Sequence, residues 1–244
     1  MKAATATPSF FVGWDVGGWN CDKNAKSRDA IVVLDFALNM VGQPWRGNLR
    51  ECISTARTTR DWLKALFTKC KAELPEGDVK ITMAIDTPLG FSSEFVSLIT
   101  RQVCVEPDAT SGRNRYLFRQ TERDLFERGL KPLSAIKDMI GSQATKGMHA
   151  LAKFAPQIKS CGVWTDGQGF CAIESYPAVA GKSPLIKRLL RHHKSLHHRD
   201  QDDARVCAVV AQLFSQKREA LAAPTDDVPR NEGWIWIPQD IPNA

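Results

Sequence analysis

Short runs of apolar residues predict β-strands in the first third of the chain. The segment Phe10 to Val16 is apolar except for Asp15, and Ala30 to Ala37 is a second run that is rich in β-branched residues. A third run, Val79 to Ile85, leads directly into Asp86, after which a proline and a glycine turn the chain away from a sheet. These three runs predict three neighbouring strands.

Helical spacing separates the second run from the third. From Thr58 or Thr59 onward, apolar residues recur every four positions, which predicts a capped helix that ends at Pro75 and Gly77. A helix that leads back into a strand favours parallel strand pairing. This part of the chain therefore predicts an α/β fold.

The remaining segments extend this α/β pattern. Residues 91–158 carry helical patterns and no strand pattern, which predicts a helical insertion, and residues 162–175 are typical of a hairpin. Two further helices are expected at 183–198 and 201–221. Because no repeat or linker divides the chain, we expect a single domain over 1–244.

Composition and charge narrow the class of protein. The chain is 43% hydrophobic and 25% charged and has no long apolar segment, which predicts a cytosolic protein that does not enter membranes. Its seven cysteines contain no CxxC pair, which argues against a disulfide framework or a zinc site. A net charge of +6 is compatible with a polyanionic partner.

Acidic side chains follow several of the predicted apolar elements. Asp15, Asp86 and Glu174 each lie at the end of an apolar run, and Asp202 and Asp203 open the last long helix. A carboxylate beside a core is unfavourable unless a cation or hydrogen bonds offset its charge. Because the carboxyl ends of parallel strands open on one side of a sheet, these acids are expected to converge.

A convergent set of oxygen ligands suits Mg²⁺ or Mn²⁺. Two such ions can activate a water molecule and stabilise the leaving oxygen of a phosphodiester. Taken singly, each acid is equally well explained as a turn or capping residue. The joint pattern favours a metal site formed by Asp15, Asp86, Glu174, Asp202 and Asp203, and it predicts these residues as catalytic.

Six motifs carry a family resemblance across almost the whole chain. They are GWDVGG at 13–18, AIDTPLGF at 84–91, RQTERDL at 119–125, AIESYPAVA at 172–180, QDDARVCAVVA at 201–211 and EGWIWIP at 232–238. In this order they resemble the predicted ribonuclease-H-like nucleases known as domain of unknown function 429. The resemblance implies a ribonuclease-H-like mixed sheet flanked by helices, the same five metal-binding acids, and Arg119 and Glu122 in the same cleft.

The chain departs from this family at one place. It has Val206 and Cys207 where the family pattern expects a third acid in the last helix. The resemblance therefore leaves Asp202 and Asp203 as the acids of that helix.

A basic stretch, Lys187 to Arg199, precedes the acidic pair of the last helix. Lys187, Arg188, Arg191 and Lys194 are expected to contact phosphates of DNA or RNA, as is Arg119 of the insertion. A solvated helix face explains the stretch equally well when it is taken alone. Its position next to the acids favours substrate binding.

The leading hypothesis is a metal-dependent nuclease that hydrolyses phosphodiester bonds in DNA or RNA. One alternative is a small kinase or ATPase of the actin-like superfamily, whose first strand also carries a DxGG element. Its second copy could only be Asp166 to Gly169, which a hairpin turn explains better. The other alternative is a non-catalytic nucleic-acid-binding module, which the missing third acid favours.

Overall fold

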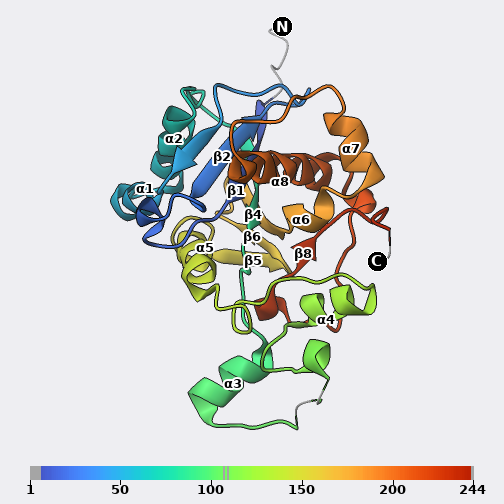
Figure 1. The fold of residues 1–244 in the computed structure, drawn as a ribbon. Coiled ribbons are helices and arrows are strands. Elements are labelled where there is room, and N and C mark those ends of the chain that lie inside the picture. Colours follow the sequence, from blue (N-terminus) through green and yellow to red (C-terminus); the bar gives the residue numbers. More distant parts are fainter. Residues whose placement is uncertain (1–6, 107, 109, 243–244) are drawn as a thin grey trace, which may run out of the picture.

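Eight strands form one mixed sheet in the computed structural model, which describes residues 7–106, 108 and 110–242 (Figure 1). The strands are β1 Ser9–Asp15, β2 Asp29–Leu34, β3 Trp45–Gly47, β4 Lys80–Asp86, β5 Gln157–Ser160, β6 Val163–Thr165, β7 Phe170–Ser175 and β8 Ile235–Trp236. Their order is β3-β2-β1-β4-β7-β6-β5, and β8 pairs with β7. Strand β1 runs parallel to β4 and β4 runs parallel to β7, whereas β2 and β6 run antiparallel to their neighbours.

Helices cover both faces of this sheet. They are α1 Arg50–Thr55, α2 Thr59–Lys69, α3 Ser93–Arg101, α4 Gln120–Glu127, α5 Gly141–Phe154, α6 Pro177–Ala180, α7 Pro184–Leu190 and α8 Arg199–Gln216. Short 3₁₀ turns occur at Cys21–Lys23, Ser111–Arg113, Arg218–Ala220 and Arg230–Glu232. The fold is therefore α/β with an open mixed sheet flanked by helices.

Alternate residues of the central strands supply two separate cores. Val12 and Trp14 of β1 pack on the face covered by α2 and α5, together with Trp62 and Phe154, whose rings stack at 4.6 Å. Phe11, which precedes Val12 in β1, packs on the opposite face with residues of α8. This alternation is the period-two pattern of a sheet that is buried on both faces.

Helix α8 lies directly against β1 because Gly13 has no side chain. A Cβ atom at Gly13 would lie 1.7 Å from the carbonyl oxygen of Ala204 and 2.5 Å from the amide nitrogen of Ala208. Any larger residue would push the helix off the sheet. The first glycine of the GWDVGG motif thus sets how closely α8 and its acidic residues approach the end of β1.

The structure confirms the predicted strands of the first half and the hairpin. Thr58 caps α2, as expected, through a capping box with Asp61. The predicted end of this helix is wrong, since α2 stops at Lys69 and Lys71 adopts a left-handed φ of 54°. The expected helical insertion also ends slightly earlier, because β5 begins at Gln157.

The predicted helix over 183–198 is wrong in its second half. Helix α7 ends at Leu190, and a loop follows as far as the start of α8. Side chains of α8 hold this loop: Asp202 accepts hydrogen bonds from the amide of Leu196, and Arg205 donates to the carbonyl of Lys194 at 2.7 Å. These tertiary contacts replace the helical hydrogen bonds of the segment.

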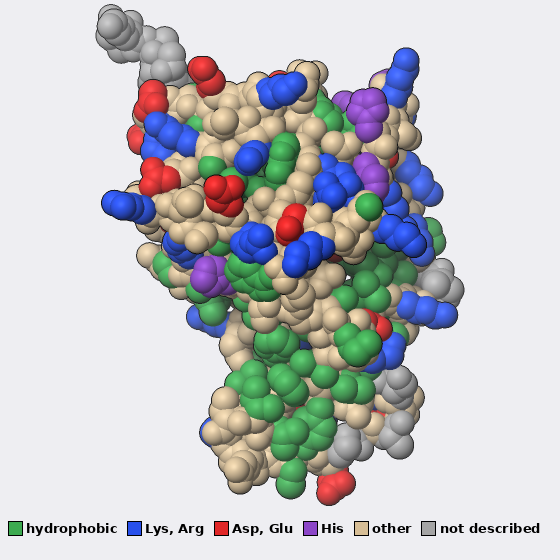
Figure 2. Space-filling model, turned by 60° about the vertical axis from the view of Figure 1, so that its left-hand side comes forward, with side chains coloured by type: hydrophobic (Ala, Val, Ile, Leu, Met, Phe, Trp, Pro, Cys, Tyr) green, Lys and Arg blue, Asp and Glu red, His purple; other side chains and the backbone are tan. Residues whose placement is uncertain are grey.

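The helices α3, α4 and α5 lie between β4 and β5, and α3 projects as a separate lobe at the bottom of Figure 1. No residue of α3 is buried, and Figure 2 shows apolar side chains gathered over this lower part of the molecule. Among the described residues, no helix is long and apolar enough to cross a membrane.

Candidate active site

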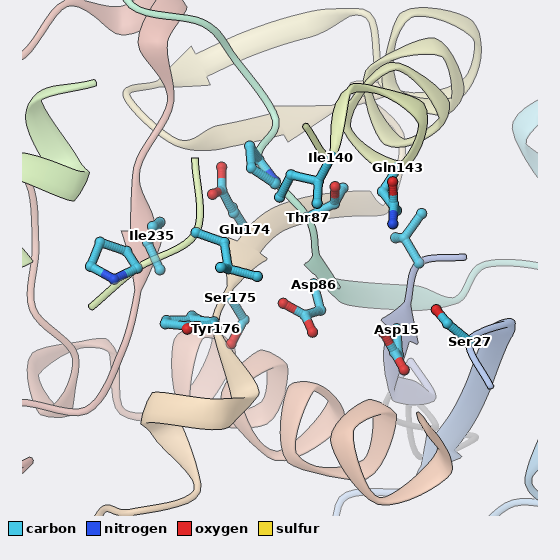
Figure 3. Close-up of a pocket in the computed structure, with 14 residues that line it drawn as sticks. Asp15, Ser27, Asp86, Thr87, Ile140, Gln143, Glu174, Ser175, Tyr176 and Ile235 are labelled. Carbon is cyan, nitrogen blue, oxygen red and sulfur yellow. The ribbon is translucent and has the colours of Figure 1, made fainter. Parts of the chain in front are cut away.

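Asp15 and Asp86 end two adjacent parallel strands at the same level. They are direct register partners in the β1–β4 ladder, so that both side chains lie at the carboxyl end of these two strands. Figure 3 shows both carboxylates at this strand end. Both residues are half-buried, and neither makes a side-chain hydrogen bond or ion pair to the rest of the described chain. The predicted convergence of these two acids is confirmed.

Asp203 joins this pair from helix α8. It precedes Ala204, the residue that packs on Gly13, and its carboxylate pairs with Arg199 at 3.3 Å. Burial raises the pKa of Asp15, and the charges of Asp86, Asp200 and Asp203 raise it further. The acids of β4 and α8 are therefore close enough to Asp15 for their charges to raise its pKa.

The pKa of Asp86 is also raised well above its ordinary value. Burial is the main cause, and the charges of Asp203 and Glu174 add to it, whereas Arg199 acts in the opposite direction. Like charges that are brought together in a partly desolvated site favour protonation or an added cation. When both are ionised, Asp15 and Asp86 therefore carry negative charge that no ion pair among the described residues balances.

A cavity of about 170 Å³ opens beside the two acids. One part of its wall is polar and is formed by Asp15, Ser27, Asp86, Thr87, Gln143 and Ser175, together with Glu174. The other part is apolar and is formed by Val16, Pro88, Pro132, Leu133, Ile140, Tyr176 and Ile235. Because four of these residues lie between positions 132 and 143, the helical insertion forms a roof over the strand ends.

Glu174 belongs to a buried ion cluster and does not face the aspartate pair. The guanidinium of Arg119 holds both of its oxygens, at 2.6 and 2.8 Å, and the amide of Leu89 donates to it at 2.9 Å. Figure 3 shows the carboxylate of Glu174 turned away from Asp15 and Asp86. The structure therefore places Glu174 near the site, with its oxygens directed to other partners.

Arg119 has no N–H donor left for a substrate phosphate in this arrangement. Its five donors form five hydrogen bonds, two to Glu122, two to Glu174 and one to the carbonyl of Glu232. Arg119, Glu122 and Glu174 are each at most 2% exposed. Burial opposes the charged guanidinium, but Glu122 and Glu174 hold the pKa of Arg119 above its ordinary value. This cluster is built as a structural support beneath the cleft.

The other predicted site residues belong to α7, to the loop that follows it and to the first turn of α8. Asp202 pairs with Arg205 at 2.6 Å and supports the preceding loop, so its carboxylate is directed away from Asp15. The side chains of Lys187, Arg188, Arg191 and Lys194 are exposed. Figure 2 shows basic and histidine side chains gathered on the upper right of that face. The two neighbouring acids therefore have different surroundings. Asp202 supports the loop before α8, whereas the charge of Asp203 acts on Asp15.

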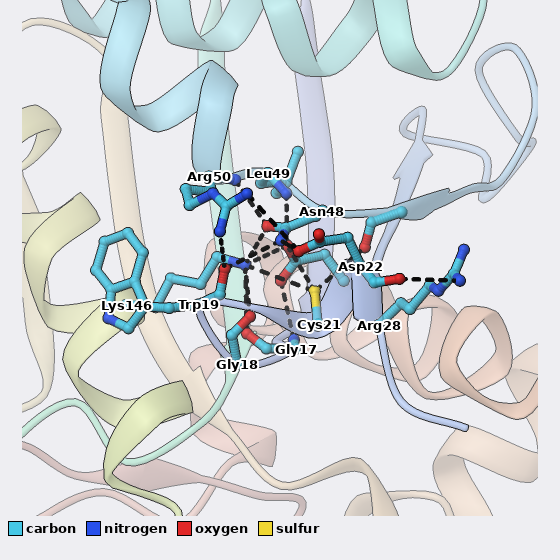
Figure 4. A network of polar contacts seen from close by, with 12 residues as sticks. Gly17, Gly18, Trp19, Cys21, Asp22, Arg28, Asn48, Leu49, Arg50 and Lys146 are labelled. Carbon is cyan, nitrogen blue, oxygen red and sulfur yellow. Dashed lines mark hydrogen bonds and ion pairs between the residues drawn. The ribbon is translucent and has the colours of Figure 1, made fainter. Parts of the chain in front are cut away.

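A second buried ion pair supports the turn that follows Asp15 (Figure 4). Lys146 of α5 lies 2.5 Å from Asp29, and both side chains are completely buried. Lys146 also donates to the carbonyls of Gly17 and Gly18, while Asp29 accepts from the amide of Gly17 at 2.9 Å. The insertion is thereby attached to the Gly-Gly turn at the end of β1.

The polar atoms around the aspartate pair fit a hard cation such as Mg²⁺ or Mn²⁺. The hydroxyls of Thr87 and Ser175 line the cavity and are buried without a hydrogen-bond partner in the described structure. Asp15, Asp86 and Asp203 supply carboxylate oxygens, which these ions prefer. The described residues contain no preformed cluster of three His, Cys, Asp or Glu ligands. Mg²⁺ sites in proteins usually combine one or two carboxylates with several water ligands.

Several residues of this site were not found from the sequence. Ser175 and Tyr176 directly follow Glu174 in the ESYP motif, so the motif itself carried the signal for them. Asp200 raises the pKa of Asp15 from the first turn of α8, where it looks like a helix cap. Gln143 lies in the insertion and has no sequence signal that links it to the strand ends.

Comparison of the chain with protein-family models, with curated proteins and with solved structures finds no match in any of the three. The resemblance to domain of unknown function 429 therefore stays a prediction that rests on the six motifs.

Proposed function

We propose that this chain is a metal-dependent nuclease of ribonuclease-H-like fold that hydrolyses phosphodiester bonds in DNA or RNA. The observation that carries the proposal is the register pair Asp15 and Asp86, with Asp203 beside it and no internal ion pair for the two strand-end acids among the described residues. The sheet, in which β2 runs antiparallel to the parallel strands β1, β4 and β7, is compatible with that fold.

In this proposal, Asp15, Asp86 and Asp203 hold Mg²⁺ or Mn²⁺ at the strand ends. The bound ions would lower the pKa of an attacking water and stabilise charge on the phosphodiester oxygens. The exposed cations of the basic stretch hold the polyanionic backbone beside the cleft. The Arg119 cluster fixes the floor of the cleft, and the Lys146–Asp29 pair fixes the turn after Asp15.

The replaced third acid bears on the non-catalytic alternative. Asp203 and Cys207 are four residues apart on α8, which places them on one face of the helix. Burial raises the pKa of the Cys207 thiol, and the charges of Asp86, Asp15 and Asp203 raise it further, so this position adds a neutral group to the site. Metal binding by the three remaining carboxylates is the property that separates a nuclease from a binding module.

The actin-like alternative is less well supported. The turn Asp166 to Gly169 precedes β7, whereas Glu174 lies at its other end with the aspartate pair. Asp166 accepts hydrogen bonds from three amides of its own turn, those of Gln168, Gly169 and Phe170. A second phosphate-binding turn would have to face Asp15, and this one lies at the opposite end of the parallel strands.

The test combines metal binding with cleavage for Asp15→Asn and Asp86→Asn. Mn²⁺ binding is measured by calorimetry, and cleavage is measured on labelled single- and double-stranded DNA and RNA. Each substitution removes one carboxylate from the pair, so we expect both Mn²⁺ affinity and cleavage to be lost while the fold is retained. Asp78→Asn is the matched control, because Asp78 is an exposed residue just before the opposite end of β4.

Two outcomes contradict the proposal in different ways. Unchanged cleavage by both variants would exclude the aspartate pair as the catalytic site. Tight Mn²⁺ binding by the unmodified protein without cleavage of any of the four polymers would instead favour the non-catalytic module.

A further inference from the structure

The cavity beside the aspartate pair has two chemically different ends. Asp15 and Asp86 lie at one end, and Tyr176 and Ile235 lie at the other (Figure 3). Leu133 adds apolar surface to the lining of the same cavity. The charge of Asp86 contributes to the raised pKa of Tyr176, after burial, which places the phenol within the field of that carboxylate. The Tyr176 hydroxyl donates to the carbonyl of Lys131 at 3.1 Å. This hydrogen bond ties the ring to the insertion loop.

The residues of the helical insertion limit the size of a ligand that can enter the cavity. Pro132, Leu133 and Ile140 of the insertion line the cavity opposite the strand ends. Its volume of about 170 Å³ is below the about 300 Å³ at which pockets for whole drug-sized ligands begin. One flat ring system fits such a space, and a stacked base pair does not. Leu133 remains 48% exposed although it lines the cavity, so its apolar surface is available to a ligand.

We propose that the apolar end of the cavity, formed by Tyr176, Leu133 and Ile235, receives one unpaired nucleobase, so that the enzyme acts on single strands. This inference rests on the proposed nuclease function and names its substrate class. Aromatic side chains bind bases by stacking without regard to sequence. The phosphate next to the stacked base then lies toward the acidic end, while the exposed basic stretch holds the backbone outside.

The test compares a strand of eight thymidines with an abasic strand of equal length and with a blunt duplex, by fluorescence anisotropy in the presence of Ca²⁺. Stacking of one base predicts that the unmodified protein binds the thymidine strand about 5- to 150-fold more tightly than the abasic strand. Tyr176→Ala should remove most of this difference, and Tyr176→Phe should keep it. Tyr116→Ala is the matched control, since the hydroxyl of Tyr116 bonds to Val105 outside the cavity.

Leu133→Ala provides a second variant at an exposed position, where the fold is not at risk, and it should weaken binding of the thymidine strand but not of the abasic strand. Equal affinity for the thymidine and abasic strands, or for the single strand and the duplex, would overturn the inference even if the enzyme cleaves nucleic acid. Binding of thymidine monophosphate as tight as that of the strand would also overturn it, in favour of a mononucleotide substrate. Absence of both binding and Mn²⁺-dependent cleavage for every polymer would overturn this inference together with the proposed nuclease function.

Discussion

Replacement of Arg119 by methionine is expected to destabilise the protein strongly. Methionine retains an apolar stem but removes five hydrogen bonds and leaves Glu122 and Glu174 as buried carboxylates without a cation. Loss of one partner from a buried ion pair costs about 3–5 kcal/mol. Because two carboxylates lose their partner here, and each keeps one backbone amide donor, we expect a loss near the upper end of that range.

Urea unfolding followed by tryptophan fluorescence measures this loss. With an m value of about 3 kcal/mol/M, a loss of about 5 kcal/mol lowers the urea midpoint by about 1.7 M. Addition of Glu122→Gln and Glu174→Gln to the Arg119→Met variant removes the stranded charges and should recover part of the stability. Arg128→Met is the control on the same segment, with an expected change within about 0.5 kcal/mol.

The same experiment decides between two roles for Arg119. The sequence predicts a phosphate ligand, whereas the structure directs every donor of this side chain to protein acceptors. If Arg119→Met kept the midpoint of the unmodified protein and instead lost affinity for oligonucleotides, the guanidinium would be a phosphate ligand and the structural assignment would be wrong.

Three further predictions concern the pH dependence, the second ion pair and the basic stretch. Because the folded-state pKa values of Asp15 and Asp86 lie above the ordinary value of 3.8, the folded state binds these protons more tightly than the unfolded state. The metal-free protein should therefore lose stability as the pH rises from about 4 through the raised values, and Asp86→Asn should flatten this decline in urea titrations at several pH values. Lys146→Met should cost about 3–5 kcal/mol in the same assay, and Asp29→Asn in that background should recover part of it; a cost below about 1 kcal/mol would contradict the role of the pair. Neutralising the four lysines and arginines at 187–194 should lower the slope of log affinity against log salt by about 0.7 for each single-strand phosphate that these side chains neutralise. An unchanged slope would show that the stretch is only a solvated surface.

The sheet and the aspartate pair were predictable because their signals are local. Each strand is a short apolar run, and the acid follows within the same run, so that one stretch of sequence contains both the element and its functional end. Asp15 and Asp86 are placed side by side by parallel pairing alone, which the helix between the runs already indicated. Strands β3 and β8, which the sequence did not predict, have only three and two residues, too few for a period to be visible.

The partners of the buried charges were not predictable because they come from distant parts of the chain. Lys146 and Asp29 are 117 positions apart, and Arg119 meets Glu174 across 55 positions. In the sequence Arg119 is one cation among several in a helical region, a pattern from which a phosphate contact is predicted. Only the packed structure shows that it is buried while its neighbour Arg123 remains partly exposed.

The distribution of counter-charges is the strongest physical argument for where an external cation binds. Asp29 is neutralised by Lys146, Glu174 by Arg119, and Asp200 by Arg46 at 2.8 Å. In each of these cases the ion pair offsets the free energy that is lost when the carboxylate is removed from water. Asp15 and Asp86 lie among them, in register and partly desolvated, and receive no such partner from the described residues. Arg199 offsets part of the charge at Asp86, and protonation or a cation from solution can balance the rest. At neutral pH a divalent ion competes directly with the proton for the same oxygens. Mn²⁺ affinity should accordingly fall as the pH is lowered through the raised pKa values, and a pH-independent affinity would mean that the ion binds elsewhere.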